Sequence, residues 1–274
     1  MKCLLYSCLI FIAIFLGSDV KSQDCQVNND AFLFHERVDY TIYYHLAGMW
    51  VGAGDVYFKV DSTQIAETDY YHINSYGRTY KKYDWLYKVR DSYESYVNTK
   101  TFKPIRFKRE VNEGSTHLKE DYIFRHKDKE VISLRKMGED SLLVKDTVPL
   151  LDCSYDVITM IYFARNMDFS GLEVGETMPI NIFLDNKSHE TYVRYLGKKE
   201  LKIKGTGTFR CILFSPYLIE GTIFNGGEDM TVWVTDDKNK VPLYIETPIL
   251  VGSIRARINN MEGLKYPLDS KIAD

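Results

Sequence analysis

Alternation of apolar and polar residues dominates the chain from about residue 35 onward. In the segment 38–44 (VDYTIYY), apolar side chains fall at every second position. This period of two is typical of a β-strand that buries one face. Segments 55–60 and 86–97 show the same pattern. We therefore expect a protein made mainly of β-strands.

Segments of the same kind continue almost to the C-terminus, separated by turn-forming residues such as Glu113-Gly114 and Asn225-Gly226-Gly227. Three early glycines, Gly48, Gly52 and Gly54, suggest a bulge, a tight turn or closely approaching strands. The remaining expected strands are 65–76, 104–111, 119–125, 130–136, 141–145, 177–184, 189–195, 199–204, 207–215, 221–224, 230–234, 241–247 and 251–258.

One segment departs from this alternation and predicts a short helix over about residues 154–165. Asp152 and Ser154 are good helix N-cap residues, and the apolar positions that follow have helical spacing. We expect about three turns that lie across the sheet and bury Ile158, Ile161 and Tyr162.

No repeat, low-complexity linker or internal boundary interrupts this pattern. The fold class expected is therefore mainly β, with a single large curved antiparallel sheet or an open barrel and one short helix. The domain should span 35–260, after a mobile leader at 23–34 and before a frayed tail at 261–274.

The first residues predict export. Lys2 precedes an apolar run that is too short for a membrane-spanning helix, and Val20-Lys21-Ser22 fits a cleavage site. We interpret 1–22 as a cleaved signal peptide, with an uncleaved anchor as the alternative. A lipid anchor on Cys25 is disfavoured because Asp24 precedes that cysteine. The expected location is the periplasm.

Three cysteines would remain after cleavage, namely Cys25, Cys153 and Cys211. An odd number permits at most one disulfide and leaves one free thiol. Cys153 with Cys211 is the first pair to test, although buried unpaired cysteines are an equal alternative.

Composition narrows the function classes. The net charge of −3 and the pI of about 6.1 give no basic footprint for nucleic acid. The six histidines show no zinc-type spacing, and neither a nucleophile elbow nor a phosphate-binding glycine loop is present in the sequence. We therefore expect no metal and no cofactor, and the sequence indicates no catalytic residue.

Two adjacent acids, Asp236 and Asp237, could form a carboxylate pair or the tip of a turn. They lie between the apolar segments 232–234 and 243–245, and Asp and Asn favour turns because their side chains bond nearby backbone groups. The turn is the preferred interpretation.

Aromatic residues gather between Tyr70 and Tyr87, interleaved with basic ones. Ordinary cross-strand pairing explains such a cluster in most proteins. An aromatic wall for an amphipathic or sugar-like ligand is the functional alternative, with Tyr80, Trp85 and Tyr87 as candidates.

Three groups of residues, taken in order, resemble the bacterial family called domain of unknown function 3108. They are 86–96 followed by Pro104, 107–109 and 113–114; then 156–159 with 162–165; then 207–211 with 232–237 and Pro242. The similarity covers about 32–258. It implies an exported, mostly β-sheet envelope protein of Gram-negative bacteria, and it supplies no activity and no catalytic residues.

The resemblance also marks motif positions, which complete the set of candidate ligand-binding residues. Arg90 and Asp91 should point to opposite faces of a strand, so one of them faces the interior. A buried charge needs a partner, and an ion pair of Arg165 with Asp91 or Glu113 would supply it. The whole candidate set is Tyr80, Trp85, Tyr87, Arg90, Asp91, Glu113, Arg165 and Trp233.

The leading hypothesis is a non-catalytic binder that holds an apolar or amphipathic ligand, such as a lipid or glycan precursor, against the concave face of the sheet. One alternative is an envelope glycan hydrolase, which would need two carboxylates in the same cleft. Another is a structural or assembly partner that binds a second envelope protein through a sheet edge.

Overall fold

A computed structural model of the 274-residue chain describes residues 27–46, 48–220, 226–249 and 252–273. The expected signal peptide at 1–22 and the expected strand at 221–224 lie outside these ranges. The described elements are β1 (Arg37–Leu46), β2 (Met49–Ile65), β3 (Thr68–Thr79), the 3-10 helix η1 (Lys81–Tyr83), β4 (Arg90–Asn98), β5 (Pro104–Glu113), β6 (Thr116–Arg125), β7 (Glu130–Met137), β8 (Val144–Pro149), β9 (Ser154–Tyr155), α1 (Val157–Ala164), β10 (Thr177–Leu184), β11 (Lys187–Ile203), β12 (Gly207–Pro216), β13 (Thr231–Thr235), β14 (Pro242–Pro248), β15 (Ser253–Glu262) and β16 (Lys271–Ala273).

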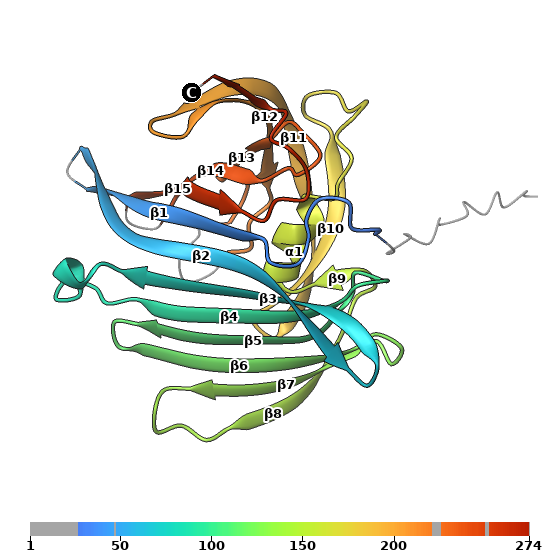
Figure 1. The fold of residues 1–274 in the computed structure, drawn as a ribbon. Coiled ribbons are helices and arrows are strands. Elements are labelled where there is room, and N and C mark those ends of the chain that lie inside the picture. Colours follow the sequence, from blue (N-terminus) through green and yellow to red (C-terminus); the bar gives the residue numbers. More distant parts are fainter. Residues whose placement is uncertain (1–26, 47, 221–225, 250–251, 274) are drawn as a thin grey trace, which may run out of the picture.

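All of these strands belong to one sheet, which confirms the predicted fold class. Its order is β8-β7-β6-β5-β4-β3-β2-β1-β15-β14-β13-β12-β11-β10-β9, with β16 paired to β12. Neighbours along this order are antiparallel except β9 and β10, which are parallel. The pairing of β1 with β15 joins the strands of the first half of the chain to those of the second half, so the described strands form one continuous sheet (Figure 1).

The sheet is strongly curved. Register shifts interrupt β1 between Ile42 and Tyr43 and β11 between Tyr195 and Gly197, and such bulges bend a strand and increase its twist. Gly54 confirms the expected close approach of strands, because a Cβ there would lie 2.2 Å from the Arg78 carbonyl oxygen.

The two ends of the sheet approach each other beside the turn between β10 and β11, and among the described residues no strand ladder joins β8 to β9 or β10. At the turn between β10 and β11, the Asn186 backbone N–H donates to the Tyr122 hydroxyl at 3.2 Å. The Ser188 hydroxyl donates to the Pro149 carbonyl at 3.2 Å. Side-chain contacts therefore bring the ends together, and the result is an open barrel.

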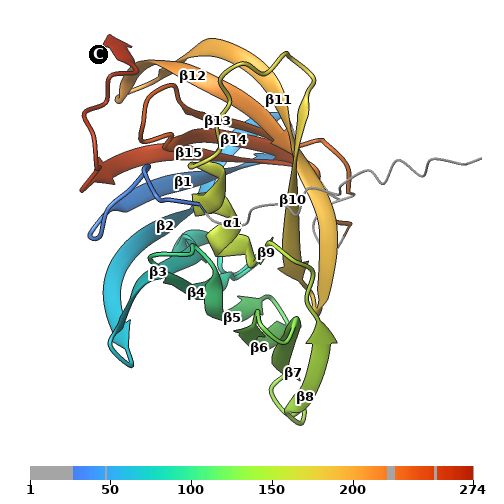
Figure 2. The ribbon, with the colours of Figure 1, turned by 90° about the vertical axis from the view of Figure 1, so that its right-hand side faces the viewer.

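The concave face of the sheet holds the main core, with α1 lying inside the curve (Figure 2). Asp156 caps this helix by accepting hydrogen bonds from the backbone N–H groups of Ile158 and Thr159. The helix is shorter than predicted, with eight residues, because Ser154 and Tyr155 pair with β10 as a strand. Thr159 is fully buried beside Ile158 and Tyr162, whereas Ile161 is only partly buried.

The expected mobile leader is wrong for its described part, because Ala31 and Phe32 are buried in the main core. Phe32 packs edge-to-face against Tyr162 of α1, with ring centroids 4.8 Å apart, so this segment helps to hold the helix in place.

The expected frayed tail is also wrong. A second buried cluster lies on β1 and on strands β11 to β15, and Leu264 and Leu268 of the C-terminal segment pack against it. The segment ends in β16, which pairs with β12. Apolar side chains at these two positions thus cover sheet surface that would otherwise face water.

The turn interpretation of Asp236 and Asp237 agrees with the structure. Asp237 accepts hydrogen bonds from the Thr235 hydroxyl at 2.8 Å and from the Asn239 backbone N–H at 3.0 Å. Its other oxygen accepts from the Ser270 hydroxyl at 2.7 Å. This carboxylate therefore holds the turn between β13 and β14 and fastens the C-terminal segment to it.

The proposed Cys153–Cys211 disulfide is wrong. Cys211 is a free, buried thiol, whereas Cys153 is disulfide-bonded. Burial raises the pKa of the Cys211 thiol to about 12, so it stays protonated and behaves as a small apolar core residue. Cys25 lies outside the described residues.

Candidate functional site

An apolar cavity of about 370 Å³ lies between α1 and the concave face of the sheet. It falls in the size range of small-molecule sites. Its lining comes from α1, from β1 and β2, from β10 to β15, and from the segment after β12. The lining residues are Val38, Tyr40, Val56, Phe58, Val157, Met160, Ile161, Tyr162, Ala164, Arg165, Ile180, Ile182, Leu184, Thr191, Tyr192, Val193, Phe214, Pro216, Tyr217, Leu218, Ile219, Met230, Val232, Val234, Pro242, Ile245 and Ala256.

Strand alternation produces this lining. Val232 and Val234 of β13 line the apolar cavity, whereas Trp233 between them packs against the second cluster. Ile180 and Ile182 of β10 repeat the same spacing in the lining. Because successive side chains in a strand point to opposite faces, a β-branched residue at every second position makes an apolar inner wall.

The helix that closes the apolar cavity is anchored by a buried polar cluster. Asp156 accepts hydrogen bonds from the hydroxyl of Ser95 on β4 and from the hydroxyl of Thr159, each at 2.7 Å. All three residues are buried. The carboxylate therefore caps the helix and ties it to the sheet at the same time, which fixes the helix face that Met160, Ile161 and Tyr162 contribute.

Among the described lining residues Arg165 is the only charged one, and it forms a buried ion pair with Glu36. The guanidinium donates to both Glu36 oxygens, one of them at 2.9 Å, and its Nε donates to the Asn239 carbonyl at 3.0 Å. Arg165 is 2% exposed and Glu36 is fully buried. The expected pairing of Arg165 with Asp91 or Glu113 is therefore wrong.

Most other polar side chains of the lining already have partners. The Tyr40 hydroxyl donates to the Pro242 carbonyl at 2.8 Å, and the Thr191 hydroxyl donates to the Tyr217 carbonyl at 2.8 Å. The Tyr192 hydroxyl donates to Glu228. These groups are satisfied within the protein and leave the surface toward the apolar cavity largely apolar.

The hydroxyl of Tyr162 differs from these groups. Tyr162 is 1% exposed, and its hydroxyl has no hydrogen-bond partner among the described residues. Burial, with the nearby Glu36 carboxylate, raises the pKa of Tyr162 well above its usual value, against the opposing effect of Arg165. The phenol therefore stays neutral and able to donate a hydrogen bond.

The predicted aromatic candidates do not line the apolar cavity. Tyr80, Trp85 and Tyr87 belong to the connection between β3 and β4 that contains η1, and none of them lines it. Trp85 is 82% exposed and Tyr87 is 51% exposed.

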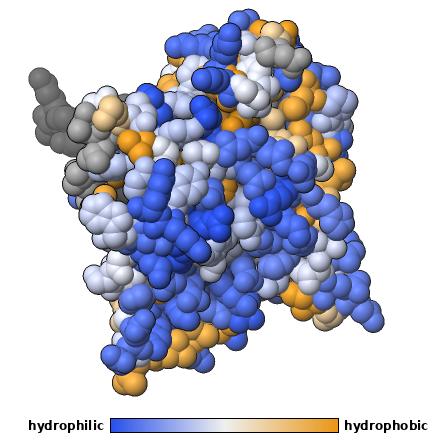
Figure 3. All heavy atoms as spheres, turned by 60° about the vertical axis from the view of Figure 1, so that its left-hand side comes forward, coloured by the Kyte–Doolittle hydropathy of each residue, from blue (hydrophilic) through white to orange (hydrophobic). Residues whose placement is uncertain are grey.

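One face of the molecule is shown in Figure 3: its centre is hydrophilic, and hydrophobic residues gather toward its lower and right margins.

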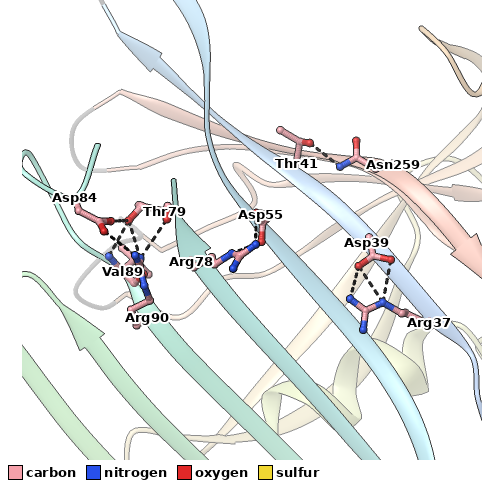
Figure 4. A network of polar contacts seen from close by, with 10 residues as sticks. All are labelled: Arg37, Asp39, Thr41, Asp55, Arg78, Thr79, Asp84, Val89, Arg90 and Asn259. Carbon is pink, nitrogen blue, oxygen red and sulfur yellow. Dashed lines mark hydrogen bonds and ion pairs between the residues drawn. The ribbon is translucent and has the colours of Figure 1, made fainter. Parts of the chain in front are cut away.

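Arg90 contacts residues of the connection between β3 and β4. It donates to Asp84 at 2.7 Å and to the Thr79 hydroxyl at 3.2 Å, and the Thr79 hydroxyl in turn donates to Asp84 at 2.9 Å (Figure 4). Separate ion pairs, Arg78 with Asp55 and Arg37 with Asp39, follow the neighbouring strands. Arg90 thus stabilises a loop.

Asp91 and Glu113, two of the candidate residues, lie close together. Asp91 is buried and accepts a hydrogen bond from the Asn112 backbone N–H at 2.9 Å. Burial and the neighbouring Glu113 raise the pKa of Asp91 to about 7, although the Asn112 hydrogen bond lowers it. The pair lies outside the lining of the apolar cavity.

Of the eight candidate residues, the structure therefore places only Arg165 at the apolar cavity. The sequence pattern did assign Tyr162 to the buried face of the helix, but it gave no sign that its hydroxyl would lack a partner. No cluster of possible metal ligands occurs in the described part of the chain, and none of its helices is long and apolar enough to cross a membrane.

Comparison with known proteins agrees with the fold. A search of curated proteins gave no match. A crystal structure described as a beta-barrel-like protein of domain of unknown function DUF1849 from Brucella abortus is similar, with a TM-score of 0.56 over 85% of this chain and 98% of that one. Its sequence identity is 11%, so the likeness concerns the fold alone.

The family model described as "Protein of unknown function (DUF3108)" matches residues 39–259. This range runs from β1 to β15 and includes α1 and most strands of the apolar cavity. The chain belongs to the DUF3108 family.

Proposed function

We propose that this protein is a non-catalytic binder of an apolar or amphipathic ligand, and that it works in the periplasm after export. The observation that carries the proposal is the apolar cavity, enclosed by α1 and the concave sheet and lined almost wholly by aliphatic and aromatic side chains. Apolar surface that leaves water on binding contributes about 25 cal/mol per Å², so an apolar chain is the ligand that such a lining favours. A lipid or the lipid part of a glycan precursor has this chemistry.

The lining also argues against the hydrolase alternative. Glycoside hydrolysis uses two carboxyl groups on either side of the bond that is cleaved. None of the described lining residues is Asp or Glu, and the buried acid Glu36, which contacts the lining residue Arg165, is held in an ion pair with it. The Asp91 and Glu113 carboxyl groups lie elsewhere. This geometry therefore favours binding over that reaction.

Fluorescence titration with the uncharged apolar probe N-phenyl-1-naphthylamine tests the proposal. We expect saturable binding to the wild-type protein and at least tenfold weaker binding to Val232→Phe, whose larger side chain fills part of the apolar cavity. Val144→Phe is the matched control, because Val144 is exposed on β8 and the same change there should leave binding unaltered. A second lining variant, Ala256→Leu, covers the case that Val232→Phe does not fold.

Probe binding that is absent from the wild-type protein would contradict the proposal. So would equal binding by wild type and by both folded lining variants, because the probe would then be attached elsewhere.

A further inference from the structure

The apolar cavity contains one feature that an ordinary apolar core would not keep. A buried hydroxyl without a partner costs free energy, and such groups are uncommon in folded proteins. Tyr162 has such a hydroxyl in a lining where Tyr40, Thr191 and Tyr192 are all paired. Phenylalanine would fill the same space without this cost. The Tyr162 hydroxyl is therefore available to a partner that no described residue supplies.

The surroundings of Tyr162 restrict the charge that a hydrogen-bond partner of its hydroxyl can carry. Arg165 lies beside Tyr162, with its guanidinium carbon 5.3 Å from the centroid of the ring. Its positive charge is neutralised by Glu36, and its nitrogens also bind the carbonyls of Asn239 and Ala31. No other lining residue in the described part of the chain is charged. A carboxylate or phosphate at this end would be a buried charge without a free cation, which is very costly.

The size of the apolar cavity restricts the length of the ligand. At about 30 Å³ per non-hydrogen atom, as in liquid water, 370 Å³ accommodates about a dozen such atoms. This corresponds to one medium-length alkyl chain with a small polar group, or to one end of a longer lipid.

We propose that the ligand is a single-chain lipid whose buried end carries an uncharged hydrogen-bond acceptor, such as a hydroxyl or an ester or amide carbonyl, and that the Tyr162 hydroxyl donates to it. This inference rests on the proposed function, since it assigns the ligand class of the same apolar cavity. A charged headgroup, where the lipid has one, lies at the opposite, outer end.

Competition against bound N-phenyl-1-naphthylamine tests the assignment with decane, 1-decanol and decanoate at pH 8. We expect 1-decanol to displace the probe from wild type about tenfold better than decane does, since one hydrogen bond in an apolar site contributes on this scale. Decanoate should be the weakest competitor. In Tyr162→Phe the advantage of 1-decanol over decane should shrink to less than about threefold.

Tyr122→Phe is the matched control. Tyr122 is equally buried but does not line the apolar cavity, and its hydroxyl accepts a hydrogen bond from Asn186. The preference for 1-decanol should survive in this variant. Without a ligand, Tyr162→Phe should unfold at the same temperature as wild type or a higher one, because it removes only an unpaired group.

The outcomes separate the two proposals. Absence of probe binding contradicts the proposed function and this inference together. Probe binding with equal displacement by decane and 1-decanol, or with decanoate competing as well as 1-decanol, leaves the apolar binder in place and overturns the role of Tyr162. An unchanged preference for 1-decanol in Tyr162→Phe overturns it as well.

Discussion

At the scale of single residues, Asp91 makes the stability of the protein depend on pH. Its pKa is raised to about 7 in the folded state by burial and by Glu113, whereas an unfolded Asp titrates near about 3.9. Between these values the folded state holds a proton that the unfolded state has lost. The free energy of unfolding should therefore fall as the pH rises from about 4 to about 7, by about 1.4 kcal/mol per pH unit at most, and level off above.

Urea denaturation of wild type, Asp91→Asn and Glu113→Gln across this pH range checks the prediction. Asp91→Asn keeps an oxygen for the Asn112 backbone N–H and should flatten the profile, leaving it more stable than wild type above pH 7. Glu113→Gln removes the negative charge beside Asp91 and should partly flatten the profile of unfolding free energy against pH. A slope in Asp91→Asn equal to that of wild type would show that another group is responsible.

The partner of Arg165 could not be predicted from the sequence. The pattern indicated that Arg165 needs a partner, and the structure supplies Glu36, which lies 129 positions earlier in the chain. Nothing in the local spacing of either residue identifies the other. Only the folded topology, which places the segment before β1 beside the end of α1, brings them together.

At the scale of elements, the attachment of α1 to β4 depends on Asp156. Asp156→Ala removes the N-cap and leaves the buried hydroxyls of Ser95 and Thr159 without their shared acceptor. We expect a loss of about 2 to 4 kcal/mol in the free energy of unfolding, measured by urea denaturation. Asp156→Asn, which retains a capping oxygen, should lose less.

Asp152→Ala is the control for this prediction. Asp152 is exposed and pairs with Lys129 at the surface, so its loss should change the free energy of unfolding by about 0.5 kcal/mol or less. If Asp156→Ala were as mild as Asp152→Ala, the buried cluster would not be what fastens the helix.

Elements with a clear periodicity were predictable, and their ends were less so. The alternation in 38–44 and 86–97 predicted β1 and β4 because those strands bury one face, but β4 begins only at Arg90, and residues 86–89 belong to the connection before it. The start of α1 was placed too early, because Ser154 and Tyr155 prefer to pair with β10, a contact that local spacing does not reveal. The segment after 262 was misjudged for the same reason, since Leu264 and Leu268 gain their burial from a distant cluster.

At the scale of the whole molecule, one curved sheet encloses both a packed core and an apolar cavity. The curved sheet was predictable from many successive strands without an internal boundary. The position of the apolar cavity was not, because it depends on how β1 and β15 join the two halves and on where α1 lies inside the curve. The predicted aromatic candidates Tyr80, Trp85 and Tyr87 lie instead on the connection between β3 and β4, outside the lining of the apolar cavity.

The measurement that tests the central claim most directly is native mass spectrometry of the protein, expressed from its full-length chain and purified without detergent. The account predicts a mass increment from one bound lipid that disappears after extraction with organic solvent and is reduced in Val232→Phe but retained in Val144→Phe. A spectrum showing only the mass of the polypeptide, or an increment that is the same in both variants, would contradict the claim that the apolar cavity holds the ligand.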